Sequence, residues 1–300
     1  MTMASGGFIM NTRYGRRMNR VIFLGRKTKY KRRILIGCAL ITAAAVFCIW
    51  QNNALTVSKY EYETQKVNGH FDGYVICQIS DLHNKMFGKD QGRLLKRIRN
   101  EKPDLIVITG DIIDGNHTHV ETALSLAASL PDIAPAYYVT GNHEYRVAPR
   151  VLDALLRGLE QSGIEILDND AREISYENDG FYLLGLDDNS LTDKTLEHLV
   201  SDLDKNRLQI LLAHEPQNFE KYAETGVDLV FSGHAHGGQI RIPFVGGLVA
   251  PDQGFFPKYT CGIYKYKQTE MLVSRGLGNS ILPVRVFNRP EIVILTLRSR

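Results

Sequence analysis

The sequence lacks features that mark several common classes of protein. It has only four cysteines in 300 residues and no Cys-x-x-Cys pair, which argues against a thiolate zinc site and a disulfide framework. Gly-x-Ser-x-Gly is absent, and its nearest approach, residues 278–282, lacks the second glycine, so a nucleophilic serine hydrolase is not indicated. Repeats and low-complexity tracts are also missing. The length suits one large domain with an appendage.

Acidic residues are absent from the first 33 positions, which hold ten of the 36 Lys and Arg residues. All 33 Asp and Glu residues come later, together with the other 26 Lys and Arg, so the remainder carries −7 although the whole chain carries +3. An acidic main domain argues against a non-specific nucleic-acid binder, because contacts with a phosphate backbone need a basic surface.

Residues 34–50 form an uncharged apolar run, ILIGCALITAAAVFCIW, that follows directly on Lys31, Arg32 and Arg33. Its length is close to the minimum of about 17 residues for a membrane-spanning helix. The positive-inside rule then puts the basic end in the cytoplasm. We expect a cytoplasmic tail over 1–33, a transmembrane anchor over 34–50, an aperiodic polar stalk over 51–70 and an extracytoplasmic domain over 71–300.

Other interpretations of the apolar run stay open. A cleaved signal peptide would need a small-x-small site, and residues 51–54 (QNNA) offer a poor one, so an uncleaved anchor is preferred. A buried core helix is disfavoured because the run follows a solvated basic tail. Residues 32–35 (RRIL) also have a weak similarity to a twin-arginine export signal.

After residue 70, strand-like and helix-like segments alternate. Helical spacing is present at 90–101, 119–130, 149–161 and 192–203. Apolar strand-like runs occupy 74–80, 105–109, 136–140, 208–213 and 227–232. The alternation predicts sheets with helices on their outer faces. Since open α/β sheets bind ligands at the carboxyl ends of strands, the polar residues that follow these five runs predict one common site.

Those polar residues are the types that divalent metals accept. They are Asp81, His83, Asp111, Asn142, His143, His214, His234 and His236. Taken singly, most are ordinary turn or core residues, and only Gly-His-Ala-His-Gly-Gly at 233–238 favours metal binding by itself. A carboxylate such as Asp111 can bridge two ions, and a metal pair that activates water on a phosphate needs such a bridge. The ordered set therefore indicates a binuclear metal site.

In order and chemistry these motifs resemble the calcineurin-like metallophosphoesterases over residues 72–297. The resemblance implies a four-layer α/β/β/α sandwich after the transmembrane helix. It implies one metal ion at Asp81, His83, Asp111 and His236, and a second at Asp111, Asn142, His214 and His234. His143 would contact the phosphate or the leaving-group oxygen, either as general acid or to stabilise charge that develops in the transition state. A metal-bridging hydroxide would attack phosphorus.

Residues 233–239, 251–254, 274–278 and 288–291 resemble the membrane-associated bacterial branch of that family, although Ala235 replaces a common threonine. That branch includes exported phosphodiesterases and enzymes that cleave UDP-diacylglucosamine. We therefore expect a phosphodiesterase or pyrophosphatase with two divalent ions (Mn, Fe, Zn or Co) and a substrate linked to lipid or the cell envelope. Arg275 would meet a substrate phosphate or simply be a surface arginine. A metal-binding scaffold without turnover is the alternative.

Overall fold

The structure, a computed structural model, describes residues 12–177, 179–279 and 283–300, with side chains from residue 30 onward. Residues 1–11 of the expected basic tail, and 280–282 of the segment closest to a serine-hydrolase motif, lie outside the described residues. The chain divides into two units, Met1–Ile49 and Trp50–Arg300.

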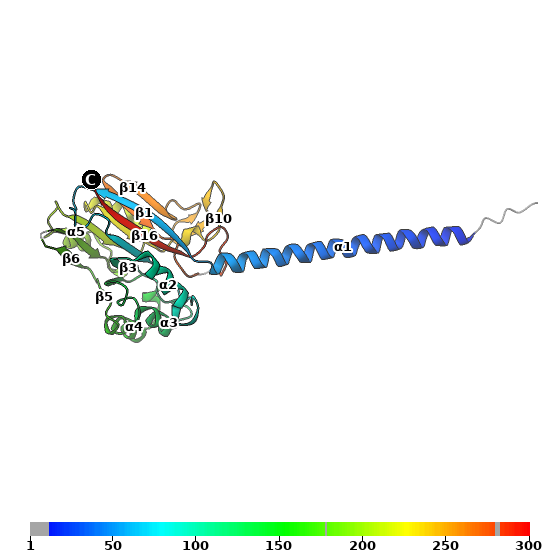
Figure 1. Ribbon diagram of the computed structural model, residues 1–300, viewed down its shortest axis with the longest axis horizontal. Coiled ribbons are helices and arrows are strands. Elements are labelled where there is room, and N and C mark those ends of the chain that lie inside the picture. Colours follow the sequence, from blue (N-terminus) through cyan, green and yellow to red (C-terminus); the bar gives the residue numbers. More distant parts are fainter. Residues whose placement is uncertain (1–11, 178, 280–282) are drawn as a thin grey trace, which may run out of the picture. The chain divides into compact units, whose positions relative to one another are not determined.

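The first unit belongs to helix α1 (Thr12–Asn53), which Figure 1 draws as one continuous helix. Within it, Tyr30–Asn53 is the one stretch of the described residues that is long and apolar enough to cross a membrane. The helix therefore runs through the expected anchor at 34–50 and its last residues enter the second unit. No proline interrupts residues 12–53, and proline is the residue that breaks a helix most strongly, which agrees with an unbroken helix.

The second unit contains two six-stranded sheets and two short hairpins. The first sheet has the order β1 (Thr56–Thr64), β16 (Glu291–Ser299), β2 (Val75–Ile79), β3 (Leu105–Thr109), β4 (Ala136–Val139), β5 (Glu165–Ile166). The second has the order β14 (Gly262–Tyr266), β15 (Thr269–Val273), β9 (Leu229–Ser232), β8 (Leu208–Leu212), β7 (Asp179–Gly185), β6 (Asp170–Tyr176). The hairpins pair β10 (Arg241–Ile242) with β11 (Gly246–Gly247) and β12 (Val249–Ala250) with β13 (Gly254–Phe255).

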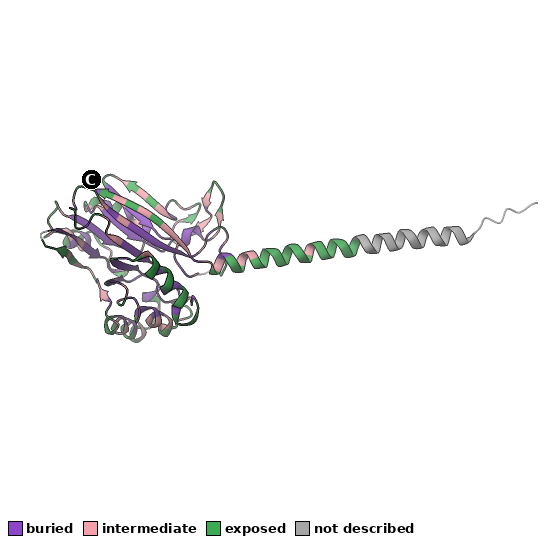
Figure 2. Ribbon diagram, in the orientation of Figure 1, coloured by how far each residue is buried: buried purple, intermediate pink, exposed green. Residues whose placement is uncertain are grey.

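The two sheets pack face to face. Alternate residues of a strand point to opposite faces of its sheet, so they enter different cores, one between the sheets and one under the helices. In β3, Leu105 and Val107 enter the core between the sheets, whereas Ile106 and Ile108 face the helices on the other side. Figure 2 shows the inner strands of both sheets as mainly buried, whereas the edge strands β1, β6 and β14 are partly exposed. This alternation explains why β3 is apolar at every position.

Helices cover the two outer faces. Leu94 of α2 (Gly92–Glu101), Leu126 of α3 (Val120–Ala127) and Leu155 of α4 (Pro149–Gln161) pack on the first sheet. Leu199 of α5 (Asp193–Val200) and Phe219 of α6 (Phe219–Glu224) pack on the second. The expected four-layer α/β/β/α sandwich is confirmed.

The structure corrects the expected stalk at 51–70. Residues Thr56–Thr64 form β1, which pairs in parallel with the whole of β16 and is the edge strand of the first sheet. A polar edge strand is half-buried and lacks an apolar run: Tyr60 and Tyr62 pack against the inter-sheet core while Lys59, Glu61 and Glu63 face solvent. The folded unit consequently begins well before residue 71.

Substitution of Leu295 by alanine tests the inter-sheet core. Leu295 is fully buried in the middle of β16, between the two sheets. We expect Leu295→Ala to lower the free energy of unfolding by about 2–5 kcal/mol, because it removes transfer free energy and leaves a cavity. Denaturant titration of the full chain in detergent measures this. Ile263→Ala, on exposed β14, should cost less than about 1 kcal/mol, and equal losses would contradict the packing described.

Candidate metal centre

The topology brings the five motifs to one place. Strands β2, β3 and β4 are parallel neighbours in the first sheet, and β8 and β9 are parallel neighbours in the second. Their carboxyl ends lead directly into Asp81, Asp111, Asn142, His214 and His234. A hydrogen bond from the backbone N–H of His234 to Asp81 Oδ1 (2.9 Å) joins the two sheets at this point.

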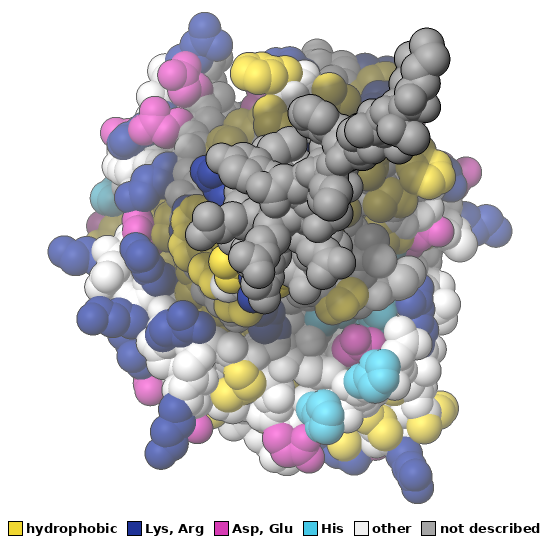
Figure 3. Space-filling view, turned by 90° about the vertical axis from the view of Figure 1, so that its right-hand side faces the viewer, with side chains coloured by type: hydrophobic (Ala, Val, Ile, Leu, Met, Phe, Trp, Pro, Cys, Tyr) yellow, Lys and Arg dark blue, Asp and Glu magenta, His cyan; other side chains and the backbone are white. Residues whose placement is uncertain are grey.

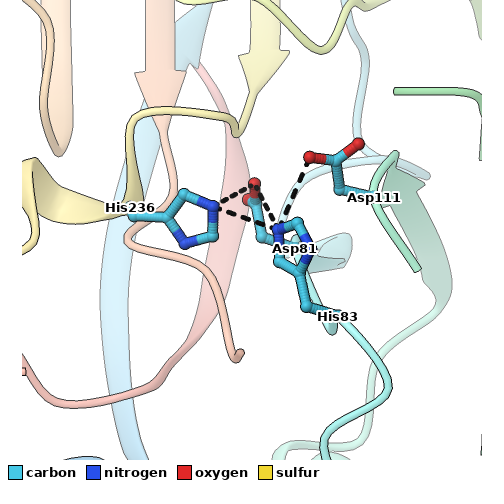
Figure 4. A group of neighbouring side chains, drawn as sticks. All are labelled: Asp81, His83, Asp111 and His236. Carbon is cyan, nitrogen blue, oxygen red and sulfur yellow. Dashed lines mark hydrogen bonds and ion pairs between the residues drawn. The ribbon is translucent and has the colours of Figure 1, made fainter. Parts of the chain in front are cut away.

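Four buried side chains converge in a first cluster: Asp81, His83, Asp111 and His236. His83 Nε2 lies 3.1 Å from His236 Nε2 and 3.5 Å from Asp111 Oδ2, and His236 Nε2 lies 3.5 Å from Asp81 Oδ1 (Figure 4). Two imidazole nitrogens and two carboxylates thus point their lone pairs at a common volume. This donor set fits a divalent cation.

A second cluster shares Asp111 with the first and adds His214 and His234. His214 Nε2 lies 3.2 Å from Asp111 Oδ2 and 3.1 Å from His234 Nδ1. His214 Nδ1 lies 2.8 Å from the carbonyl oxygen of Thr109, which can only accept, so this nitrogen carries a proton. The tautomer leaves the Nε2 lone pair of a neutral His214 directed into the cluster.

The side-chain amide of Asn142 lies at the second cluster, close to Asp111 Oδ2 (3.2 Å) and Arg146 Nη2 (2.6 Å). With its nitrogen towards Asp111 and its oxygen towards Arg146, the amide donates to the carboxylate and accepts from the guanidinium. Turned by half a rotation, the same amide would direct its oxygen at the second cluster, and an amide oxygen is a ligand that divalent ions accept.

Burial sets the protonation of most of the imidazoles. It lowers the pKa of His83 to about 3 and that of His234 to about 4, and it holds the pKa of His236 well below the ordinary value. Burial alone would raise the pKa of Asp111, but the adjacent His214, by charge and hydrogen bond, keeps it well below the usual range. Neutral His83, His234 and His236 beside an ionised Asp111 are the protonation states that metal binding requires. His214 is the exception, because burial lowers its pKa but the adjacent Asp111 outweighs burial and raises that pKa well above its ordinary value.

The backbone at the site is unusual. Five of the clustered residues have positive φ, a region that non-glycine residues seldom adopt. They are Asp81 (52°), His83 (44°), Asp111 (53°), His234 (64°) and His236 (47°). Each such conformation costs on the order of 1–3 kcal/mol, and strain of this kind concentrates at functional sites. Gly110 (φ 80°) permits the close approach, since a Cβ there would lie 2.6 Å from the nitrogen of Gly141.

His143 lies beside the first cluster. Its ring packs edge-on against His83, with centroids 4.5 Å apart. Burial lowers the pKa of His143, and Nδ1 accepts a hydrogen bond from the N–H of Gly115 at 3.0 Å, so the proton of the neutral ring resides on Nε2. Arg146 Nη1, which is also a donor, lies 3.0 Å from this Nε2. An anionic oxygen within reach of both nitrogens would accept a hydrogen bond from each of these two donors.

Sequence reasoning missed three supporting residues. Glu144 is fully buried and accepts hydrogen bonds from the N–H groups of Asp111 (2.9 Å), Gly141 (2.7 Å) and Ile113 (3.3 Å). Asp252 Oδ2 lies 2.9 Å from His234 Nε2, and Asn288 Nδ2 donates to the carbonyl oxygen of His236 at 2.7 Å. Glu144 was within reach as the fourth residue of Gly-Asn-His-Glu, whereas the other two come from distant loops.

Arg275 has a carboxylate partner. Its Nη2 lies 2.7 Å from Oε1 of the buried Glu291, and its backbone N–H donates to Oε2 of the same carboxylate. The side chain is mostly buried, with 19% of it exposed, which does not fit a plain surface arginine. Contact of Arg275 with a substrate phosphate stays a prediction.

Comparisons with known proteins agree with this geometry. A family model described as calcineurin-like phosphoesterase matches residues 74–238. The uncharacterized metallophosphoesterase YkuE of Bacillus subtilis (strain 168) is 35% identical over 235 residues, 76% of this chain and 80% of YkuE. Phosphodiesterase YaeI of Escherichia coli (strain K12) is 31% identical over 198 residues, 66% of this chain and 71% of YaeI. A Danio rerio transmembrane protein with metallophosphoesterase domain is 27% identical over 256 residues, 79% and 56% of the two chains.

Variants at Glu144 test how the metal centre is supported. Glu144→Ala leaves three backbone N–H groups without their carboxylate, and we expect Mn²⁺ affinity to fall by about 10–100-fold. Glu144→Gln should have a smaller effect, because one amide oxygen can still accept from Asp111 and Gly141. Calorimetric Mn²⁺ titration of the metal-depleted chain measures both, with exposed Glu160→Ala as control. Wild-type affinity in Glu144→Ala would contradict the role given to this carboxylate.

Proposed function

The chain belongs to the calcineurin-like phosphoesterase family and is thus a phosphoester hydrolase; on this premise we propose that it is a membrane-anchored phosphodiesterase with two metal ions. One observation carries the proposal. The same oxygen of Asp111, Oδ2, lies 3.5 Å from His83 Nε2 and 3.2 Å from His214 Nε2, so one carboxylate joins the two clusters.

In this proposal Asp81, His83, Asp111 and His236 hold one ion, and Asp111, Asn142, His214 and His234 hold the other. Divalent ions bound there would offset phosphate charge and lower the pKa of a coordinated water towards neutrality. The mixed nitrogen and oxygen ligands are compatible with Mn, Fe, Zn or Co.

The chain's own residues would then bind and protonate the ester. His143 holds a proton on Nε2, which makes it the donor to the leaving-group oxygen. Arg146 Nη1, 3.0 Å from that nitrogen, would contact a non-bridging phosphate oxygen and neutralise charge that develops there. Glu144 fixes the loops after β3 and β4, so that Asp111 and Asn142 keep their separation.

Preference for a diester over a monoester is supported by similarity to a protein named as a phosphodiesterase, YaeI. Anchoring is supported by the apolar stretch Tyr30–Asn53 and by similarity to a transmembrane relative. The ten Lys and Arg residues before residue 34 support residues 1–33 in the cytoplasm, 34–50 in the membrane and the catalytic domain outside. Phosphodiesters and pyrophosphates linked to lipids or to the cell envelope are then the accessible substrates.

Hydrolysis of bis-p-nitrophenyl phosphate and p-nitrophenyl phosphate by the full chain in detergent tests the catalytic proposal. Assays with Mn²⁺, Fe²⁺, Zn²⁺ and Co²⁺ should show metal-dependent cleavage that favours the diester. We expect His143→Ala to lower kcat by about 10²–10⁴-fold, because it removes the proton donor and leaves the proposed ligands in place. Exposed His117→Ala is the matched control and should keep wild-type activity.

Metal content, measured in parallel by inductively coupled plasma mass spectrometry, separates this enzyme from a scaffold. Two ions per chain, with turnover that depends on His143, support the phosphodiesterase. Two ions per chain without turnover of the nitrophenyl esters or of a lipid-linked nucleotide would instead identify a metal-binding scaffold protein.

The membrane orientation has its own test. Alkaline phosphatase fused after Arg300 in a bacterial host should be active, because it would be delivered outside the cytoplasm with the domain. Reversing the charge of Lys31, Arg32 and Arg33 to Glu should reduce that activity, since the charge bias that orients the helix is lost. An inactive wild-type fusion with a full-length product would contradict the extracytoplasmic assignment.

A further inference from the structure

A basic cavity lies next to the point where the chain leaves α1. It has a volume of about 400 Å³ and is lined by residues 53–55, by one face of α2 and by Arg289. Its cationic side chains are Arg93, Lys96, Arg97 and Arg289, and no Asp or Glu lines it. None of the proposed metal ligands lines it either, so it is a different site from the metal centre.

The cations of α2 are arranged for binding. Arg93, Lys96 and Arg97 stand at i, i+3 and i+4, which places them on one face of the helix. All three are exposed, and within the described residues none forms an ion pair. The opposite face of α2, with Leu94, Leu95 and Ile98, is buried in the core and fixes the direction of the basic face. Lys and Arg side chains (dark blue) are numerous on the left of the surface shown in Figure 3.

Other cations hold the chain at the mouth of the cavity. Arg289 donates to the carbonyl oxygens of Ala54 (2.9 Å) and Leu55 (2.8 Å), and its guanidinium lies 5.1 Å from the ring centroid of Trp50. Lys85 Nζ donates to the carbonyl oxygen of Asn52. The cavity wall at residues 53–55 is thereby fixed to the folded domain.

Chain length places this wall at the edge of a bilayer. Asn53 lies three residues beyond Trp50, the last residue of the apolar run, which is about 4.5 Å along a helix. The polar headgroup layer on each side of a bilayer is roughly 5–8 Å thick. If residues 34–50 span the membrane, the residue that lines the cavity lies at the depth of lipid phosphates.

We propose that this cavity binds the phosphate headgroup of an anionic phospholipid of the membrane that holds the anchor. The proposal rests on the anchoring part of the proposed function and does not depend on its catalytic part. Three cations of α2 without an ion pair, and no carboxylate in the lining, make the cavity attractive to an anion, and the cavity is large enough for a glycerophosphate group. Juxtamembrane Lys and Arg residues attract anionic lipids in this way.

Native mass spectrometry of the full chain in detergent tests the site. The protein is mixed with equimolar phosphatidylglycerol and phosphatidylcholine, and the lipids that it retains are counted. We expect wild type to prefer phosphatidylglycerol by at least about tenfold, and Arg93→Gln/Lys96→Gln/Arg97→Gln to lose that preference. The matched control, Arg99→Gln/Arg150→Gln/Lys194→Gln, removes three exposed cations outside the cavity and should keep it.

Three outcomes would overturn the proposal: no preference in wild type, equal loss in the control, or displacement of the lipid by excess inorganic phosphate, which would identify a site for free phosphate. Turnover of bis-p-nitrophenyl phosphate is followed in the same samples and should be equal in all three proteins. Lipid preference without turnover would support the headgroup site and contradict the proposal that the protein is a phosphodiesterase. Should the triple variant not fold, Arg97→Gln alone is expected to weaken the preference, and unchanged preference would overturn the proposal.

Discussion

The site depends on one physical constraint: several electron-pair donor atoms lie close together around the buried carboxylate of Asp111. Its Oδ2 atom faces imidazole nitrogens of the buried His83 and His214, and the side-chain amide of Asn142 lies 3.2 Å from it. In the absence of a cation, a charged His214 compensates the charge of Asp111. Burial lowers the pKa of His214, but the charge and hydrogen bond of Asp111 outweigh burial and hold that pKa well above its usual value. Divalent ions bound here would supply the positive charge instead, at a point that water does not reach.

Several features that hold these side chains in place lower the stability of the folded chain. Asp81, Asp111 and His234 adopt left-handed backbone, and Glu144 is buried where its proximity to Asp111, added to burial, raises its pKa to about 8. Burial of apolar side chains in the three cores of the surrounding sheets offsets this cost in folding free energy. The cost is localised at strand ends because regular pairing stops there, and backbone hydrogen bonds to Glu144 replace the lost ladder.

The sequence predicted sheets with helices on their outer faces, and the gathering of the Asp, Asn and His motifs, because both follow from short-range rules; the four-layer arrangement was implied by the family resemblance. Apolar runs such as Leu105–Thr109 are strands buried on both faces, and parallel strands must end at the same edge of a sheet. It did not predict β1, since a charged edge strand with half-buried tyrosines lacks an apolar pattern. It marked residues 251–254 and 288–291 only as part of a family resemblance and gave Asp252 and Asn288 no role, because their contacts with His234 and His236 cross 18 and 52 residues of chain.

Asn288 connects the anchor end of the domain with the metal centre. Its backbone N–H donates to Gln51 Oε1 (3.2 Å), three positions before Ala54, and its side-chain amide donates to the carbonyl oxygens of His236 (2.7 Å) and Gln239 (3.0 Å). The next residue, Arg289, holds Ala54 and Leu55 and lines the basic cavity. A headgroup in that cavity would therefore touch the same short loop that fixes a proposed metal ligand. Because these contacts are buried hydrogen bonds, displacement of the loop would leave polar groups unsatisfied and shift His236 with it. The hydrogen bonds of Asn288 and Arg289 thus join residues 51–55, where the domain is attached to the anchor, to the loop that positions His236 at the metal centre.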